Sequence, residues 1–232
     1  MNSRVFALLA LAGLAACDPT GNTDFSRPSA NIRLANFVVD APALSMTANG
    51  SAVHSGIGFG LLSAYQRLGV DDTVLVFTRS GDGIVAGTDS VLLVEDRRYS
   101  YYGLGTVAAY KPRLLVDDTL FAAAGGIKVR IIHGIGTRST NELDFYASLP
   151  SDSLIDIAPL MPSLAYGAAS PYLTADATFR RFRLTIAGLT TAILDTTLAT
   201  AIADSSVVTL VASDTAGGGA PFRMVVVIDK AP

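Results

Sequence analysis

Phe59-Gly60-Leu61-Leu62-Ser63-Ala64-Tyr65 is the stretch that decides the fold, because it recurs later in the chain as Tyr166-Gly167-Ala168-Ala169-Ser170-Pro171-Tyr172. Both stretches read aromatic, Gly, two spacers, Ser, a small residue and Tyr, and they begin 107 residues apart (166 minus 59). Such a repeat indicates two copies of one folded unit. The shared glycine predicts a turn in each copy, since glycine takes positive φ without strain. The predicted turn residues are Phe59, Gly60, Ser63, Tyr65, Tyr166, Gly167, Ser170 and Tyr172.

Other parallels keep the same order on both sides of this motif. Ile32-Arg33-Leu34 matches Val129-Arg130-Ile131, Thr73 to Phe77 matches Phe182 to Ile186, Asp96 to Tyr102 matches Asp204 to Leu210, and Pro112 to Val116 matches Phe222 to Val226. The offset grows from 97 (129 minus 32) to 110 (222 minus 112), so the second copy has extra loop residues, most of them between His133 and Tyr166. We therefore place two units at residues 32–120 and 127–230, joined by the small-residue stretch 122–126.

Each unit is expected to consist of strands. Residues 32–34 and 127–131 alternate apolar and polar side chains, which is the period of a half-buried strand. Short β-branched runs such as 74–77 are separated by turn signals such as Asn49-Gly50, and no convincing amphipathic helix interrupts them. The pattern predicts an all-β chain with two tandem Ig-like antiparallel β-sandwiches.

The first unit resembles the DUF4397 family, a bacterial domain of unknown function. The resemblance rests on residues 32–50 with their Val39-Asp40-Ala41-Pro42-Ala43-Leu44 segment, on residues 55–60, and on Ser63-Ala64-Tyr65. Residues 129–133 look like the opening strand of a second copy, although residues 138–143 depart from the pattern at the position of Asp40 to Ala43. The resemblance implies Ig-like sandwiches in tandem on a secreted or lipid-anchored protein. It carries over no catalytic residue.

The N-terminus has the three parts of a secretory signal. Arg4 is followed by an apolar run over 5–16, which is too short to span a bilayer as a helix. Leu14-Ala15-Ala16-Cys17 resembles the lipobox of bacterial lipoproteins. That resemblance implies cleavage after residue 16 and lipidation of Cys17, whose acyl chains would anchor the protein in a membrane. The alternative is an ordinary signal peptide with an incidental cysteine. We expect residues 17–31 to hold the lipidated cysteine and a flexible tether.

The composition excludes several classes of function. The formal net charge is −3 and there is no basic run, so we expect no nucleic-acid partner. Cys17 is the only cysteine, so no disulfide, CxxC pair or thiolate metal site can form within the chain. Trp is absent, which lowers the weight of a carbohydrate-binding platform. We predict no cofactor and no metal ion.

The candidate catalytic residues do not form a known motif. His54 and His133 are the only histidines; they have no H-x-x-x-H partner, and the chain lacks a G-x-S-x-G elbow. We expect each to form structural hydrogen bonds. Gly56 to Gly60 lacks the spacing of a dinucleotide loop. Asp82 and Asp89 fit solvated turns, with calcium binding left open.

These observations predict a lipid-anchored, non-catalytic protein of the bacterial cell envelope. Two sandwiches on a tether would display loops to an envelope protein or a glycan. One alternative is a hydrolase with a cleft between the units and His54 or His133 as its base. Another is a structural subunit of an envelope assembly, which would expose an apolar strip or an unpaired strand. The oligomeric state and the choice of membrane stay open.

Overall fold

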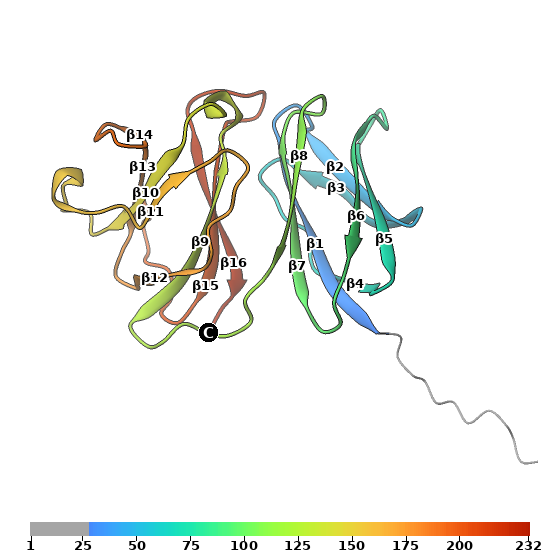
Figure 1. The fold of residues 1–232 in the computed structure, drawn as a ribbon, viewed down its shortest axis with the longest axis horizontal. Coiled ribbons are helices and arrows are strands. Elements are labelled where there is room, and N and C mark those ends of the chain that lie inside the picture. The colour runs from blue at the N-terminus through green and yellow to red at the C-terminus, as the bar shows by residue number, and fades with distance from the viewer. Residues whose placement is uncertain (1–27) are drawn as a thin grey trace, which may run out of the picture.

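The computed structural model describes residues 28–232 (Figure 1). The predicted signal peptide, Cys17 and residues 18–27 of the predicted tether lie outside the described residues. The tether prediction is wrong for residues 29–31, which are the first residues of strand β1 (Ser29–Val38). They pair with the β4 strand (Gln66–Gly69), and Ala30 is fully buried in the core of the first half. No helix within residues 28–232 is long and apolar enough to cross a membrane.

The first half of the structure contains two four-stranded sheets, in the orders β4-β1-β7-β8 and β3-β2-β5-β6. Strands β1 and β7 run parallel, and every other described pair in this half is antiparallel. Besides β1 and β4, its strands are β2 (Ala43–Ala48), β3 (Ser51–Gly58), β5 (Asp72–Arg79), β6 (Val85–Leu92), β7 (Arg98–Gly105) and β8 (Tyr110–Val116).

The second half repeats this arrangement, with sheet orders β12-β9-β15-β16 and β11-β10-β13-β14 and a parallel β9–β15 pair. Adding eight to the number of a strand in the first half gives the number of the equivalent strand in the second half. Its strands are β9 (Gly126–Gly134), β10 (Leu143–Ser148), β11 (Met161–Leu164), β12 (Leu173–Asp176), β13 (Arg181–Ile186), β14 (Ala192–Thr197), β15 (Val207–Ser213) and β16 (Arg223–Lys230). Two short 3₁₀ turns, η1 (Gly136–Arg138) and η2 (Leu154–Asp156), lie in its longer connections. The prediction of an all-β chain with two sandwiches is confirmed, with one parallel strand pair in each half.

Strand pairing corrects the alignment of the two halves near their ends. Ile32 pairs with Tyr99, and Val129 pairs with Val208, so the offset at β7 and β15 is 109 (208 minus 99). The sequence alignment paired Asp96 with Asp204, which is an offset of 108 (204 minus 96). That offset is one residue smaller than the offset in the structure. In the last strands, Ser100 pairs with Leu115 and Thr209 with Val227, which gives an offset of 112 (227 minus 115) rather than 110. Asp117, just after β8, thus corresponds to Asp229 in β16.

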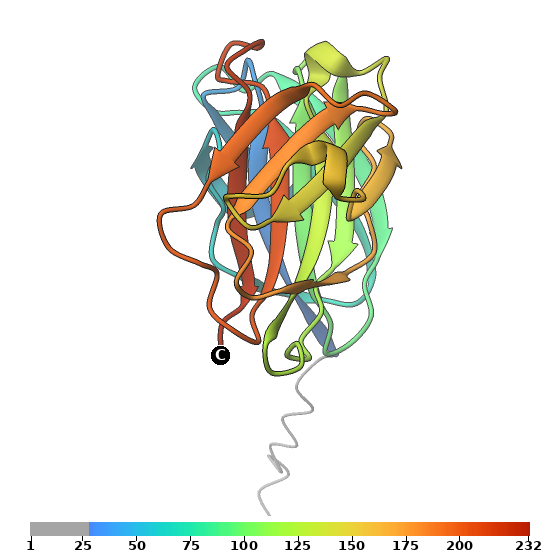
Figure 2. The ribbon, with the colours of Figure 1, turned by 90° about the vertical axis from the view of Figure 1, so that its left-hand side faces the viewer.

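The four sheets stack as layers, seen from the side in Figure 1 and turned by 90° in Figure 2. Each half has its own core between its two sheets, with Phe77 and Tyr101 in the first and Phe145 and Phe182 in the second. A third cluster lies where the two middle sheets face each other. It contains Ala35, Phe37, Tyr102 and Leu104 from the first half and Ile132, Val211 and Val227 from the second.

The middle sheets are therefore covered on both faces. Strand β15 is buried along its whole length, and β1 is buried at all but two of its ten residues. The prediction of half-buried strands at residues 32–34 and 127–131 is wrong in this respect. The polar side chains Arg33 and Arg130 point toward the other half and are only 6% and 3% exposed.

Candidate functional site

Four buried charges meet between the halves. Arg33 in β1 and Arg130 in β9 lie beside the carboxylates of Asp117 and Asp229. Each arginine makes its shorter contact with the carboxylate of the other half. Arg130 Nη2 lies 2.7 Å from Asp117 Oδ1, and Arg33 Nη2 pairs in the same way with Asp229 Oδ1. The contacts within a half are 3.8 and 3.9 Å. The two positive and two negative charges cancel. We call Arg33, Arg130, Asp117 and Asp229 the charge cluster.

A hydroxyl group connects the arginine and the aspartate of each half. Ser100 Oγ accepts from Arg33 Nε and donates to Asp117 Oδ2, both at 2.6 Å. Thr209 Oγ1 accepts from Arg130 Nε at 3.0 Å and donates to Asp229 Oδ2 at 2.6 Å. The charge cluster is thus satisfied by hydrogen bonds, which is the condition for burying ions at tolerable cost.

The terminal tyrosine of the repeated motif completes the site in each half. Tyr65 donates to Asp117 Oδ2 and Tyr172 to Asp229 Oδ2, both at 2.8 Å. The tyrosine rings also stack on the guanidinium groups, 4.7 Å from Arg33 and 4.6 Å from Arg130. These cation–π contacts shield the guanidinium faces.

The remaining guanidinium nitrogens bind backbone of the opposite half. Arg33 Nη1 donates to the carbonyl of Ile228 at 3.3 Å, and Arg130 Nη1 donates to that of Val116 at 2.8 Å. Every contact in one half has a counterpart in the other. The arrangement is that of an isologous dimer interface, formed here within one chain.

Burial shapes the ionisation of the site. Burial alone would lower the pKa of Arg130, but Tyr102, Tyr172, Asp117 and Asp229 raise it, so the guanidinium stays charged. Burial raises the pKa of Asp229, and the like charge of Asp117 adds to this, against the opposing pull of Arg130. Tyr102 is fully buried, which raises its pKa to about 12, and its hydroxyl has no partner within residues 28–232.

The repeated motif crosses between the two sheets of each sandwich. In the first half it joins β3 to β4, and in the second β11 to β12. Gly60 and Gly167 have positive φ, +76° and +73°, which favours glycine. Their N–H groups donate to the carbonyls of Asn36 and His133, both at 2.7 Å.

The other motif residues fix the crossing segment to the first strand of each half. Ser63 Oγ and Ser170 Oγ accept from the N–H groups of Leu34 and Ile131, both at 2.9 Å. At the start of the motif, the ring of Phe59 meets Phe37 edge-on, with centroids 6.3 Å apart. Tyr166 meets His133 in the same way at 5.6 Å.

The two histidines are buried and bound to backbone. His54 Nε2 lies 3.2 Å from the carbonyl of Ile32 and 3.3 Å from Ser63 Oγ, but that hydroxyl donates to the carbonyl of Ala64 at 2.9 Å. His133 Nδ1 accepts from the N–H of Ile135 at 3.3 Å. Burial lowers the pKa of both histidines, with backbone hydrogen bonds opposing it. Within residues 28–232, the only side-chain hydroxyl hydrogen-bonded to either imidazole is that of Ser63, which also donates to backbone.

The carboxylates considered for calcium bind different partners. Asp82 accepts from Arg79 Nε at 2.9 Å, and Asp89 accepts from the hydroxyl of Tyr101, also at 2.9 Å. Within residues 28–232, no group of three or more His, Cys, Asp or Glu side chains is placed to hold a metal ion.

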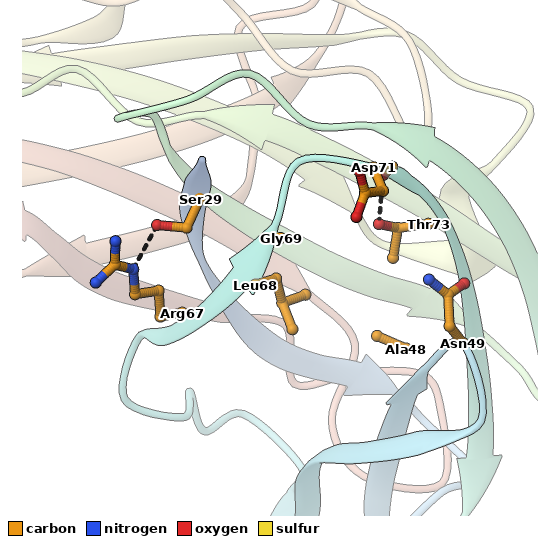
Figure 3. Close-up of a pocket in the computed structure, with 8 residues that line it drawn as sticks. All are labelled: Ser29, Ala48, Asn49, Arg67, Leu68, Gly69, Asp71 and Thr73. Carbon is orange, nitrogen blue, oxygen red and sulfur yellow. Dashed lines mark hydrogen bonds between the residues drawn. The ribbon is translucent and has the colours of Figure 1, made fainter. Parts of the chain in front are cut away.

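Two pockets lined by polar groups are candidate ligand sites. Figure 3 shows a pocket of about 440 Å³ in the first half, where Arg67 donates to Ser29 Oγ and Thr73 donates to the carbonyl of Asp71. A second pocket of about 380 Å³ lies between the halves, beside Asp214. The Asp214 carboxylate already accepts from the N–H groups of residues 136, 137 and 219 and from the Thr137 hydroxyl. In both pockets, the polar groups named here form hydrogen bonds with each other rather than pointing unpaired into the cavity.

A family model described as a domain of unknown function, DUF4397, matches residues 30–146, just over half of the 232 residues. The chain belongs to the DUF4397 family. The match runs from β1 to β10 and includes Arg33, Asp117 and Arg130 of the charge cluster. No curated protein matches the chain.

Sequence reasoning did not identify the charge cluster. One signal was present, since an arginine stands between two apolar residues in both Ile32-Arg33-Leu34 and Val129-Arg130-Ile131. The second signal, the recurrence of Asp117 as Asp229, becomes visible only with the corrected offset of 112.

Proposed function

We propose that this DUF4397 chain is a lipid-anchored, non-catalytic protein of the bacterial cell envelope that presents a rigid binding surface away from the membrane. The charge cluster is the observation that carries the rigid surface in this proposal, while the anchor rests on the lipobox-like segment that ends at Cys17. Four buried charges with paired hydrogen bonds favour one alignment of the two halves over any other. We also propose that residues 127–230 are a second DUF4397 copy, because strand order and cluster residues recur there.

The positions of the chain ends support the direction of display. Strand β1 begins at one end of the layered body, where the C-terminus also lies (Figure 1). The connections at residues 39–42, 106–109 and 135–142 lie at the opposite end, as Figure 2 also shows. We call this the distal end. With a lipid on Cys17, the distal loops would face away from the bilayer toward a protein or glycan partner.

A hydrolase is less well supported by the same geometry. The middle sheets pack through Phe37, Tyr102 and Val211 over the centre of the surface between the units. In the pocket that remains between the halves, the Asp214 carboxylate is already bound by N–H groups and the Thr137 hydroxyl. His54, the candidate base closest to a serine, is only 5% exposed.

Mass spectrometry of the protein from its native membrane tests the anchor. We expect a diacylglyceryl mass on Cys17 as the N-terminal residue, and we expect Cys17→Ala to give a soluble protein or an uncleaved precursor. An unmodified N-terminus after residue 17 would contradict the anchor.

Affinity capture from the native envelope tests the display surface, with a glycan array run beside it. The bait is residues 18–232, the mature chain without the lipidated Cys17. The test variant carries Ile84→Asp and Leu189→Asp, at two exposed residues. Their turns lie at the distal end, because Ser80 N–H donates to the carbonyl of Ala43 and Ala187 N–H donates to that of Glu142. Thr88→Asp combined with Ser90→Asp, at two exposed positions of β6, is the matched control. We expect the test variant alone to lose the bound partner. Equal capture by all three proteins would place the binding surface elsewhere.

A further inference from the structure

The end opposite the distal loops exposes apolar side chains on two connections. The β8–β9 connection carries Leu120, which is 71% exposed, and Phe121, which is 47% exposed. At the end of β6 and in the β6–β7 turn, Leu92 and Val94 are 71% and 54% exposed. We call these four residues the apolar end. Large exposed apolar side chains that gather in one region mark an interaction site.

The two connections lie next to each other. Leu120 lines a pocket of about 370 Å³ together with Arg97 and Arg98, which follow the β6–β7 turn. The N–H of Asp117 donates to the carbonyl of Arg98 at 2.8 Å, which ties the start of one connection to the end of the other. Figure 1 places both at the end of the molecule where β1 begins.

Charges around the apolar end nearly balance. Arg97 and Arg98 are exposed and form no ion pair within residues 28–232, and Lys230 Nζ lies 3.8 Å from the centroid of the Phe121 ring. Glu95 and Asp96 are exposed on the same turn, while Asp118 pairs with Lys128 at 2.6 Å. Apolar contact, rather than net charge, would therefore drive association at this end.

We propose that the apolar end rests on the lipid bilayer, with Leu120 and Phe121 at the boundary between headgroups and acyl chains. The geometry rests on the proposed anchor. Twelve residues separate Cys17 from Ser29 (29 minus 17), so the anchor lies at most ~42 Å from the start of β1 along an extended chain. The ten residues of β1 alone span ~33 Å toward the distal end. The apolar end is thus the part of the body closest to the point where the tether joins it, and the distal end lies farther from the anchor by the length of β1.

Leucine and phenylalanine are the residue types that enter this boundary in peripheral proteins. The acyl chains proposed on Cys17 hold the protein at the membrane. A second contact at the apolar end sets the orientation, so that the distal loops point outward.

Tryptophan fluorescence tests this contact directly, because the chain contains no native Trp. The mature chain, residues 18–232, contains all three core clusters, so it retains the whole described fold. An N-terminal hexahistidine holds it on vesicles of phosphatidylcholine with nickel-chelating lipid, so that the test does not depend on acylation of Cys17. The reporter is Phe121→Trp, and the matched control is Ile84→Trp, at a residue that is 46% exposed on a distal loop.

We expect the Phe121→Trp emission to move to shorter wavelength on vesicles and to lose most of its intensity when the lipids carry bromine near the headgroup. Ile84→Trp should change in neither way, and adding Leu120→Ser to the reporter should reverse the shift. Identical responses of the two reporters would overturn the inference. A blue shift that needs no vesicles and grows with protein concentration would also overturn it, because a second copy would then cover this end.

Failure of the anchor and failure of the contact give different results. Loss of the diacylglyceryl mass from Cys17 removes the proposed anchor, while the nickel-tethered reporter still decides whether the apolar end meets lipid.

Discussion

Arg130 illustrates why single residues matter at this interface. It is 3% exposed, and its guanidinium binds a carboxylate, a hydroxyl and a backbone carbonyl while it stacks on Tyr172. A buried ion pair adds little net stability compared with well-packed apolar residues, but removal of one partner leaves the other charge buried and alone. The charge cluster therefore fixes how the two halves align more than it raises the free energy of unfolding.

Replacement of Arg130 by alanine should be strongly destabilising for this reason. We expect the free energy of unfolding to fall by about 3–5 kcal/mol, since Asp117 loses its closest cationic partner. Urea unfolding of the mature chain measures the loss. Arg181→Ala is the control, because Arg181 pairs with Asp195 on the surface and such pairs contribute little. Equal losses in the two variants would show that burial of the cluster has no special cost.

The buried histidines predict a pH dependence of stability. Burial lowers the pKa of His54 and of His133 below the ordinary value near 6.5. As pH falls through ~6.5, the unfolded chain binds protons that the folded chain does not, so folded stability falls with pH until the lowered pKa values are reached. Urea unfolding between pH 7.5 and 5.5 should show this loss, and His54→Gln with His133→Gln should flatten it. Stability that rises on acidification in this range would contradict the assignment.

At the scale of elements, the repeated motif explains how two distant segments build one site. It turns the chain out of one sheet at Gly60 or Gly167, binds it to the first strand through a serine, and ends with a tyrosine on the charge cluster. The motif was recognisable from sequence because glycine, serine and tyrosine each have a separate structural task at fixed spacing.

The two glycines of the motif should both resist substitution. Valine at either position is strained at positive φ, and we expect each change to cost roughly 1–3 kcal/mol of unfolding free energy. Gly167→Val should cost more than Gly60→Val, because a Cβ at Gly167 would overlap the side chain of Lys111 of the other half. Lys111→Ala should remove that difference in urea unfolding. Gly69→Ala, at a glycine without positive φ, is the control, and a loss there equal to that at Gly60 would refute the role of the turn.

Other elements could be predicted only in part from one sequence. Strands were evident from short β-branched runs, and the sandwich class followed from their number and turn signals. The alternation in residues 32–34 and 127–131 predicted strands with one face exposed to solvent. That face is covered by the other half, and the sequence pattern of one unit does not reveal this. The later parallels slipped by one or two residues, since turns of unequal length hide register until the strand pairs are known.

We expect the whole molecule to behave as one body made from two similar halves. Each half has its own core, but both middle sheets and all four charges of the cluster are buried only while the halves stay together. An interface of this kind couples the stability of the outer sheets, although these do not touch each other. A display role depends on this coupling, because a hinge between the halves would leave the distal loops without a fixed arrangement.

Native-state hydrogen exchange of Arg33→Ala, compared with the unaltered mature chain, tests this central claim most directly. Strands β10 and β13 lie in the outer sheet of the second half, on the far side from Arg33. If the halves unfold as one unit, their amides should lose protection by the same factor as those of β2 and β5, about 100-fold for a destabilisation of about 3 kcal/mol. If β10 and β13 keep the protection of the unaltered chain while β2 and β5 lose theirs, the two halves are independent and the charge cluster does not join them.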